Sequence, residues 1–414
     1  MTGSVSGHLY VWRGRRCEKI IRAHESNVTT LYATETGVVS GGGDGFVKLY
    51  SSSLEHLRSY GLHEAQVPPL RSGVKAVCAG LDKDGVNITK IVVATESAEV
   101  YELAKDSGNW TLLSEGHYSK PEDGAGGELW GLAPHPTNPD IFATSGDDAT
   151  VRIWSISQGR LLRKAQLDCA TRCVNWNPTG TRLLVGLGGS CRGVRQKKDG
   201  AFMMLHAETL EVLYEGRDAR HWLREVKYSP DGQSFACASQ DQKVYLYDNR
   251  QNILRAKCDK HNSYVTSLDF SDDGAYVQSD AGDFEHLYHS ATDGQYFKLP
   301  SQLKNVRWFS WSCIYGWPVQ GIWPTINVER DTNDPLPPDP TSCHRSSNQD
   351  LVAVGYQDGQ GRVFRYPCVT KAAQSIPLTG HTADMPAVRF MCDDTHLVTI
   401  GKADRAICVW KITR

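Results

Sequence analysis

The sequence has no run of about 20 apolar residues, the length that a helix needs to cross a lipid bilayer. Its first residues, MTGSVSGHLYVWRGRR, lack the order of a secretory signal peptide, in which basic residues precede an apolar block. The formal net charge is −2, so no global field favours nucleic acid or an anionic membrane. We therefore expect a soluble chain that binds neither nucleic acid nor membrane.

Signatures of catalysis and of metal or cofactor binding are also missing. SGGGDG (40–45) lacks the Lys and Ser/Thr that complete a phosphate-binding loop, and GLGGS (186–190) precedes a basic loop rather than a helix. Neither G-x-S-x-G nor H-E-x-x-H occurs. The 12 cysteines are scattered, and the closest pair, Cys169 and Cys173, has no zinc-like partner set. We expect a non-enzymatic protein with no metal and no cofactor, whose thiols are buried in a reducing compartment.

Strand-like segments recur along the chain. Each has small and β-branched residues, then a turn with Asp, then an alternating strand that ends in an aromatic residue. Four examples are FATSGDDATVRIW (142–154), FACASQDQKVYLY (235–247), LVAVGYQDGQGRVF (351–364) and LVTIGKADRAICVW (397–410). Alternation with period two indicates strands, and the Gly and Asp residues between them predict hairpins.

The spacing from the turn Asp to the aromatic residue is constant at six positions. It holds for Asp44–Tyr50, Asp148–Trp154, Asp241–Tyr247, Asp358–Phe364 and Asp404–Trp410. Asp283–His289 fits with His in the aromatic place, and Ser6–Trp12 fits with Ser replacing Asp. A fixed spacing in seven places predicts an internal repeat with the same turn in each copy.

A further strand-like element precedes several hairpins, and a His stands before it at positions 24, 117, 261 and 381. This order resembles the WD40 repeat of about 40–45 residues, which implies an all-β propeller of four-stranded blades. The resemblance also implies hydrogen-bonded tetrads within blades. One would join His381, Thr399, Asp404 and Trp410, and another His117, Ser145, Asp148 and Trp154. These His–Asp pairs are then structural, because such a chain satisfies all its buried polar groups.

The repeats predict how the chain divides into domains. Hairpins end near residues 12, 50, 102, 154, 204, 247, 289, 364 and 410. In propellers of this kind the outer strand of the last blade comes from the chain start, and HLRSYGL (56–62) is the candidate here. We expect a seven-bladed WD40 β-propeller over 55–414, with 1–54 forming partial blades of a preceding propeller, as a tandem atypical propeller. A single ring of eight or more blades is the rival arrangement.

One repeat is much longer than the others: 75 residues separate His289 from Phe364, against 46 between Phe364 and Trp410. The excess contains LKNVRWFSWSCIYGWPVQGIWP (303–324), followed by an acidic, proline-rich stretch. It resembles a signature of the echinoderm microtubule-associated protein-like family, a Trp-rich strand with a Gly-(Ile/Val)-Trp-Pro motif and an acidic insertion. Segments such as GELWGLAPHP (127–136) extend the resemblance over about residues 110–414.

The resemblance implies a non-enzymatic scaffold that engages tubulin and microtubules through propeller surfaces. It places the protein in the cytoplasm on the microtubule cytoskeleton, with the ciliary or flagellar axoneme as one setting. Other microtubule-associated proteins would be further partners. The alternative function is a WD40 adaptor that reads a peptide or assembles a complex unrelated to tubulin.

Basic residues are the candidate contacts, because tubulin is acidic. CRGVRQKKDG (191–200) replaces an ordinary Asp turn and carries Arg192, Arg195, Lys197 and Lys198. A second cluster near the N-terminus contains Arg13, Arg15 and Arg16. Each is either a solvated surface or an electrostatic docking site.

The four tryptophans at 308, 311, 317 and 323 also allow two interpretations. They fill the wedge between blades, because Trp carries a large apolar area, or they form a patch that faces a partner. Trp323 is the candidate contact among them.

Overall fold

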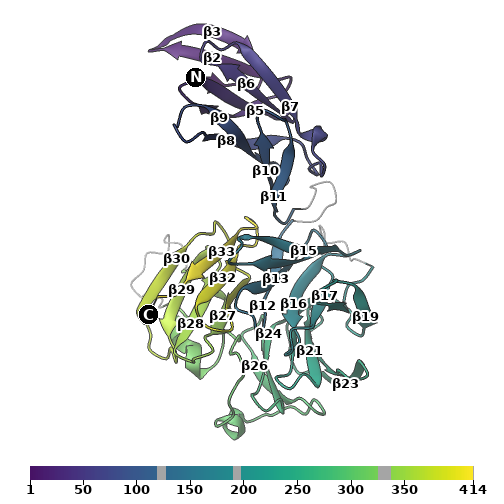
Figure 1. Cartoon of the computed structure of the whole chain (residues 1–414). Helices are drawn as coiled ribbons and strands as arrows, with labels where there is room; N and C mark the ends of the chain where they lie inside the picture. Colours follow the sequence, from purple (N-terminus) through teal and green to yellow (C-terminus); the bar gives the residue numbers. More distant parts are fainter. Residues whose placement is uncertain (119–126, 190–196, 325–336, 414) are drawn as a thin grey trace. The chain divides into compact units, whose positions relative to one another are not determined.

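A computed structural model describes residues 1–118, 127–189, 197–324 and 337–413. The chain divides into two compact units, Met1–Tyr118 and Ser119–Arg414. Both consist of antiparallel sheets in which consecutive strands are hydrogen-bonded neighbours (Figure 1). No helix among the described residues is long and apolar enough to span a bilayer.

The first unit contains three sheets. The first sheet has β1 (Thr2–Gly3), β2 (His8–Arg13) and β3 (Arg16–Arg22). The second has β4 (Val28–Ala33), β5 (Gly37–Gly42), β6 (Phe46–Ser51) and β7 (His56–Gly61), followed by the 3-10 helix η1 (Leu62–Glu64). The third has β8 (Val74–Leu81), β9 (Ile88–Thr95), β10 (Glu99–Ala104) and β11 (Trp110–Glu115). Val39 and Val47 of the second sheet share one core with Val74 and Ile91 of the third.

The strand β7 corrects the expected closure of the last blade. It pairs with β6, with His56 opposite Tyr50 and Gly61 opposite Phe46, and so completes its own sheet. A short turn brings β7 to β6 at a far smaller loop-closure cost than pairing it with the C-terminal blade. The units accordingly divide after Tyr118 rather than after residue 54, and β8–β11 belong to the first unit.

The second unit contains six sheets within its described residues. The first three are β12 (Leu129–Pro134), β13 (Ile141–Gly146), β14 (Thr150–Ser155) and β15 (Arg160–Gln166); β16 (Thr171–Trp176), β17 (Arg182–Leu187), β18 (Ala201–His206) and β19 (Val212–Arg217); and β20 (Leu223–Tyr228), β21 (Ser234–Ser239), β22 (Val244–Asp248) and β23 (Ile253–Cys258). The others are β24 (Val265–Phe270), β25 (Tyr276–Ala281) and β26 (His286–Ser290); β27 (Pro340–Arg345), β28 (Leu351–Tyr356), β29 (Gln360–Arg365) and β30 (Ser375–Thr379); and β31 (Ala387–Phe390), β32 (His396–Ile400) and β33 (Ile407–Lys411). The 3-10 helices η3 (Pro300–Leu303) and η4 (Trp317–Ile322) lie between β26 and β27.

These sheets form a closed ring. The first strands pack in succession, β12 on β16, β16 on β20, β20 on β24 and β27 on β31, and β31 returns to β12. Leu129 and Leu132 share a core with Val398 and Ile400 of the last sheet, and the Leu129 amide donates to the Lys402 carbonyl at 3.0 Å. In Figure 1 the outer strands β19, β23 and β30 lie at the periphery. The all-β WD40-type propeller is thus confirmed, with six sheets rather than seven in this unit's described residues.

The Trp-rich segment fills the ring between β24 and β27. The Phe309 amide donates to the Phe270 carbonyl at 2.9 Å, and the Arg345 amide donates to the Ser310 carbonyl at 3.3 Å. Trp308 and Trp311 are 6% and 4% exposed, within the core that joins these two sheets. They therefore act as the wedge, whereas Trp317 is 66% exposed.

Candidate functional site

The residues predicted as the C-terminal tetrad form one hydrogen-bonded chain. His381 lies with Nδ1 3.3 Å from Asp404 Oδ2 and Nε2 2.8 Å from Thr399 Oγ1, and the Trp410 indole donates to Thr399 Oγ1 at 2.9 Å. His24 is held in the same way, 2.9 Å from Asp44 Oδ1 and 2.8 Å from Ser40 Oγ. These contacts tie the turn to the strands of one sheet, which is a structural role.

The second predicted tetrad needs a correction. Trp154 donates to Thr144 Oγ1 at 2.7 Å, and not to Ser145, whose buried hydroxyl has no hydrogen-bond partner in the described structure. Asp148 Oδ2 pairs with Arg152 at 3.2 Å. His117 is buried at the end of the first unit, so its predicted place in this tetrad stays a prediction.

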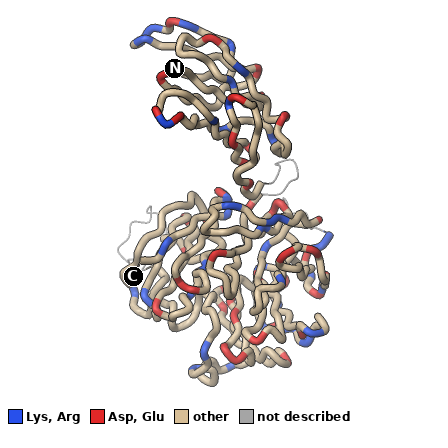
Figure 2. Tube along the Cα trace, in the orientation of Figure 1, with Lys and Arg blue, Asp and Glu red and all other residues tan. Residues whose placement is uncertain are grey.

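The predicted N-terminal basic cluster lies on the β2–β3 hairpin. Arg13, Arg15 and Arg16 are exposed, and only Arg13 has a described ionic partner, Glu18 Oε1 at 3.6 Å. Lys19 and Arg22 of β3 are exposed as well. Figure 2 shows Lys and Arg positions in blue along the chain. The hairpin therefore presents a largely uncompensated positive surface.

The predicted basic loop at 191–200 is only partly described. Arg192 and Arg195 lie outside the described residues. Lys197 is exposed, but Lys198 Nζ lies 2.7 Å from Glu215 Oε2 and 2.9 Å from Asp168 Oδ2. These two hydrogen bonds raise the pKa of Lys198 and keep it charged, and the two carboxylates compensate that charge within the fold.

Two adjoining cavities lie along the first strands of the propeller sheets. The larger, of about 440 Å³, is lined by β12, β16, β20, β24, β27 and β31. The smaller, of about 320 Å³, lies where these strands begin. Trp130, Arg172 and Arg224 line both cavities. Sequence patterns could not identify this site, because its lining comes from six sheets that lie far apart in the sequence.

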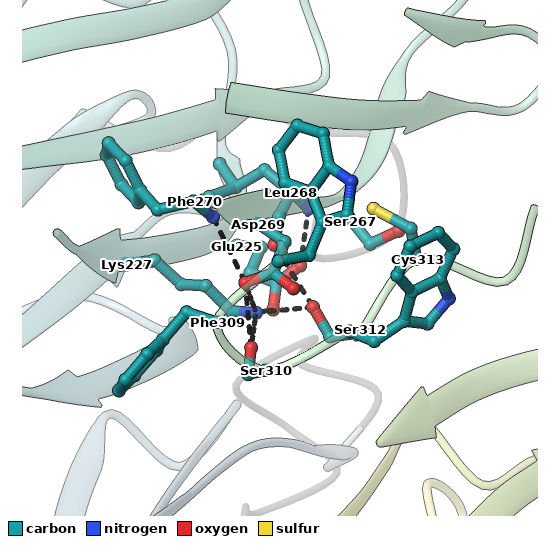
Figure 3. A network of polar contacts seen from close by, with 12 residues as sticks. Glu225, Lys227, Ser267, Leu268, Asp269, Phe270, Phe309, Ser310, Ser312 and Cys313 are labelled. Carbon is teal, nitrogen blue, oxygen red and sulfur yellow. Dashed lines mark hydrogen bonds and ion pairs between the residues drawn. The ribbon is translucent and has the colours of Figure 1, made fainter. Parts of the chain in front are cut away.

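A polar network lines the larger cavity (Figure 3). Lys227 Nζ donates to Ser310 Oγ at 3.0 Å and to Ser312 Oγ, and it lies 3.4 Å from Asp269 Oδ1. Glu225 Oε2 accepts from the Leu268 amide at 2.9 Å, and Ser310 Oγ donates to Asp269 Oδ1 at 2.7 Å. The network fastens the Trp-rich segment to β20 and β24, so its charged groups serve ring closure.

A second polar cluster fastens the same segment to β25. Asp280 Oδ2 accepts from the Ile314 amide at 2.6 Å, and Asp280 Oδ1 lies 2.5 Å from His286 Nδ1. Cys313 completes a group whose potential ligand atoms lie within 4.8 Å of one another. Burial raises the pKa of the Cys313 thiol well above its usual value, so the thiol is protonated in the metal-free protein. We interpret the group as a hydrogen-bonded clasp.

The smaller cavity opens among aromatic rings and guanidinium groups. We call its six aromatic residues the aromatic mouth: Trp130, Trp222, Tyr264, Phe284, Tyr315 and Trp323. Trp323, the predicted contact, is partly buried and stacks on Tyr315 with ring centroids 5.4 Å apart. Phe284 meets Tyr315 and Trp323 edge-on, at 6.0 and 6.4 Å.

Two arginines lie over three other rings of the aromatic mouth. Arg172 Cζ is 4.2 Å from the Trp130 ring centroid, and Arg224 Cζ is 5.3 Å from the Trp222 centroid and 5.4 Å from that of Tyr264. Arg172 also pairs with Asp147 at 3.0 Å. These distances are typical of cation–π contacts, which hold both guanidinium groups at the cavity wall.

Comparison with known proteins matches both units. The family described as "Echinoderm microtubule-associated protein second beta-propeller" matches residues 129–412, and "WD domain, G-beta repeat" matches residues 15–51. The chain is 27% identical to the 77 kDa echinoderm microtubule-associated protein of Strongylocentrotus purpuratus, over 100% of the chain and 56% of that protein. It is 30% identical to Echinoderm microtubule-associated protein-like 3 of Homo sapiens, over 94% of the chain and 40% of that protein.

A third relative agrees. Echinoderm microtubule-associated protein-like 2 of Rattus norvegicus is 28% identical over 100% of the chain and 59% of that protein. The chain thus spans about half the length of these curated relatives. The family match covers most of the chain and coincides with the closed ring of the second unit, so this chain belongs to the echinoderm microtubule-associated protein family.

Proposed function

We propose that this chain is a non-enzymatic scaffold that associates with microtubules by binding tubulin through charged surfaces of its propeller sheets. The observation that carries the proposal is the family match over residues 129–412, together with relatives that are named as microtubule-associated proteins. The proposed location is therefore the microtubule cytoskeleton of the cytoplasm. The axoneme of a cilium or flagellum is one microtubule structure on which the protein would act.

The polar clusters of the second unit support a role without catalysis. Lys227, Glu225 and Asp269 are each at most 8% exposed and bond to one another's strands or to the Trp-rich segment. The His–Asp pairs, such as His381 and Asp404, are likewise bonded within their sheets. Groups committed in this way hold the fold and are poorly placed to act on a substrate.

The β2–β3 hairpin is the proposed electrostatic contact in the first unit. Arg15 and Arg16 are exposed and have no described carboxylate partner, so an acidic protein surface can approach both. Such contacts act mainly through long-range attraction and are weakened by salt. Lys197, with Arg192 and Arg195, is proposed as a second contact, whereas Lys198 is already paired.

Co-sedimentation with stabilised microtubules tests the proposal. The full chain should bind at low salt and weaken as salt rises. The double variant Arg15→Glu/Arg16→Glu should bind at least about tenfold more weakly, because it replaces attraction with repulsion at two sites. Lys75→Glu/Lys83→Glu is the matched control, since it makes the same charge change at exposed positions elsewhere in the first unit.

Two outcomes would count against the proposal in different ways. Unchanged binding of the double variant would exclude the hairpin as a contact but leave microtubule association standing. A wild-type chain that stays in the supernatant at every salt concentration would overturn microtubule association itself for this chain.

A further inference from the structure

We propose that the aromatic mouth of the second unit binds a peptide segment that presents one carboxylate beside an aromatic or apolar side chain. This function goes beyond microtubule association, since it assigns a peptide-reading site to the propeller. It rests on an arginine without an acidic partner, on a backbone conformation unusual for Phe, and on the charges around the cavity.

Arg224 differs from the other cations at the aromatic mouth. Arg172 pairs with Asp147 at 3.0 Å, and Lys402 lies 3.7 Å from Asp384 Oδ2. Among the described residues Arg224 contacts the rings of Trp130, Trp222 and Tyr264, and no carboxylate forms an ion pair with it. Its guanidinium is therefore a partly buried cation that forms no ion pair with a carboxylate of the described residues.

Burial and the neighbouring cation make this arrangement costly for the free protein. Burial lowers the pKa of Arg224 below its usual value, and the charge of Arg172 lowers it further, although the more distant charge of Asp384 opposes this shift. A desolvated cation is stabilised when an anion with matching geometry binds to it. The guanidinium presents two parallel N–H donors to a carboxylate, which accepts both. A ligand carboxylate would thus supply the interaction that the fold leaves open.

Phe284 provides an independent observation. It follows the turn Asp283, at a position where other hairpins also adopt positive φ, as at Gly45, Ala149, Gln242, Gly359 and Arg405. Its φ is 68°, and its side chain is 67% exposed at the edge of the cavity. The hairpin turn imposes this conformation, in which a bulky side chain is strained, and the exposed ring at the cavity edge is placed to contact a ligand.

The remaining charges decide between ligand classes. Asp339 and Asp384 line the same cavity as Arg172 and Arg224. A phosphate group carries about −1.5 to −2 charges, so both aspartates would repel it strongly. A single carboxylate matches the charge of the one guanidinium that has no ion pair. The cavity of about 320 Å³ lies at the small end of ligand sites, so it admits a few side chains of an extended peptide rather than a folded domain.

A peptide array measures this specificity. Its hexapeptides carry a central Glu flanked by every pair of natural residues, and parallel arrays carry Gln or phosphoserine in place of Glu. The labelled full chain should select Glu peptides with aromatic or apolar neighbours. In solution these peptides should bind at least about tenfold more tightly than their Gln counterparts, measured by fluorescence polarisation.

Variants connect the selection to the aromatic mouth. Arg224→Gln should remove the preference for Glu over Gln, and Arg224→Lys should keep only part of it because the two-donor fork is lost. Phe284→Gly, at an exposed position, should weaken the binding of peptides in which an aromatic residue flanks the Glu. Arg182→Gln is the matched control, since Arg182 is exposed on β17, and it should bind as the wild type does.

Three outcomes would overturn the proposal: no preference for Glu over Gln in the wild type, the same preference in folded Arg224→Gln, or stronger binding of phosphoserine than of Glu. If Arg224→Gln fails to fold, Phe284→Gly decides, and unchanged selection by that variant would exclude the aromatic mouth. Microtubule co-sedimentation should be unaffected by Phe284→Gly, so the result does not depend on the proposed function.

Discussion

Trp154 donates its indole N–H to Thr144 Oγ1 at 2.7 Å, while the adjacent Ser145 hydroxyl is buried without a partner in the described structure. Trp154 pairs with Phe142 across β13 and β14, so Thr144, two positions on, lies on the same face as Trp154. Trp410 pairs with Leu397 and bonds Thr399 by the same geometry. In both blades strand register thus decides which hydroxyl faces the tryptophan. The neighbouring residue in the strand points to the opposite face of the sheet.

The two hydroxyls at this position should differ in stability. Thr144→Val leaves the buried Trp154 indole unpaired and should lower the free energy of unfolding by about 1–3 kcal/mol. Ser145→Ala removes an unpaired buried hydroxyl and should change it by no more than about 0.5 kcal/mol, or stabilise the protein. Urea unfolding followed by tryptophan fluorescence measures both. A larger loss from Ser145→Ala than from Thr144→Val would contradict the register.

Lys227 should be important for ring closure. Lys227→Met leaves the buried Asp269 without its cation, whereas Glu225 keeps Arg389 at 3.3 Å, and it should lower the free energy of unfolding by about 3–5 kcal/mol. Lys260→Met is the control, because the Lys260–Asp259 pair is 57% exposed on both sides and should contribute less than about 1 kcal/mol. Chemical denaturation compares the two. Equal effects would show that the network does not fasten the Trp-rich segment.

His289 should make the second unit sensitive to acid. Burial, with the charge of His261 second, lowers its pKa from 6.5 to about 4. The unfolded chain then binds a proton that the folded chain rejects, so stability is full above about pH 6.5 and falls as the pH drops toward 4. The loss from this residue should be about 3 kcal/mol by pH 4, as 1.36 kcal/mol per pKa unit implies.

A substitution separates His289 from other acid effects. His289→Phe places an aromatic residue where other repeats have one, and it should flatten the stability profile between pH 6.5 and 4. The exposed His221→Phe should leave the profile as in the wild type. Denaturation midpoints across this pH range measure the difference, and an unchanged slope for His289→Phe would assign the acid sensitivity elsewhere.

The left-handed backbone conformation of Phe284 should lower the free energy of unfolding of the unliganded protein. Phe284→Gly releases a non-glycine residue from the left-handed region, a strain of roughly 1–2 kcal/mol, and loses only the contacts of a mostly exposed ring. The variant should be as stable as the wild type or up to about 1 kcal/mol more stable. Phe309→Gly provides the comparison, because Phe309 is 57% exposed and is not at positive φ. Phe309→Gly should be less stable than the wild type. If thermal unfolding showed Phe284→Gly to be the less stable of the two variants, strain at Phe284 would be contradicted.

The sequence by itself determined the local repeat of this protein. Its six-residue spacing indicates hairpins because turns and strand alternation depend on near neighbours in the chain, and the long repeat with its Trp-rich segment pointed to the family. The same segment's role as a wedge could be proposed from tryptophan size alone. These inferences needed no knowledge of which sheets meet.

Only the tertiary structure decided what depends on distant contacts. It paired β7 with β6, placed β8–β11 in the first unit, and selected Thr144 over Ser145. It also gathered Trp130, Arg224 and Trp323 around one cavity. The physical reason is ring closure: a propeller brings the start of each sheet to a common channel, so residues far apart in sequence become neighbours that no local pattern encodes.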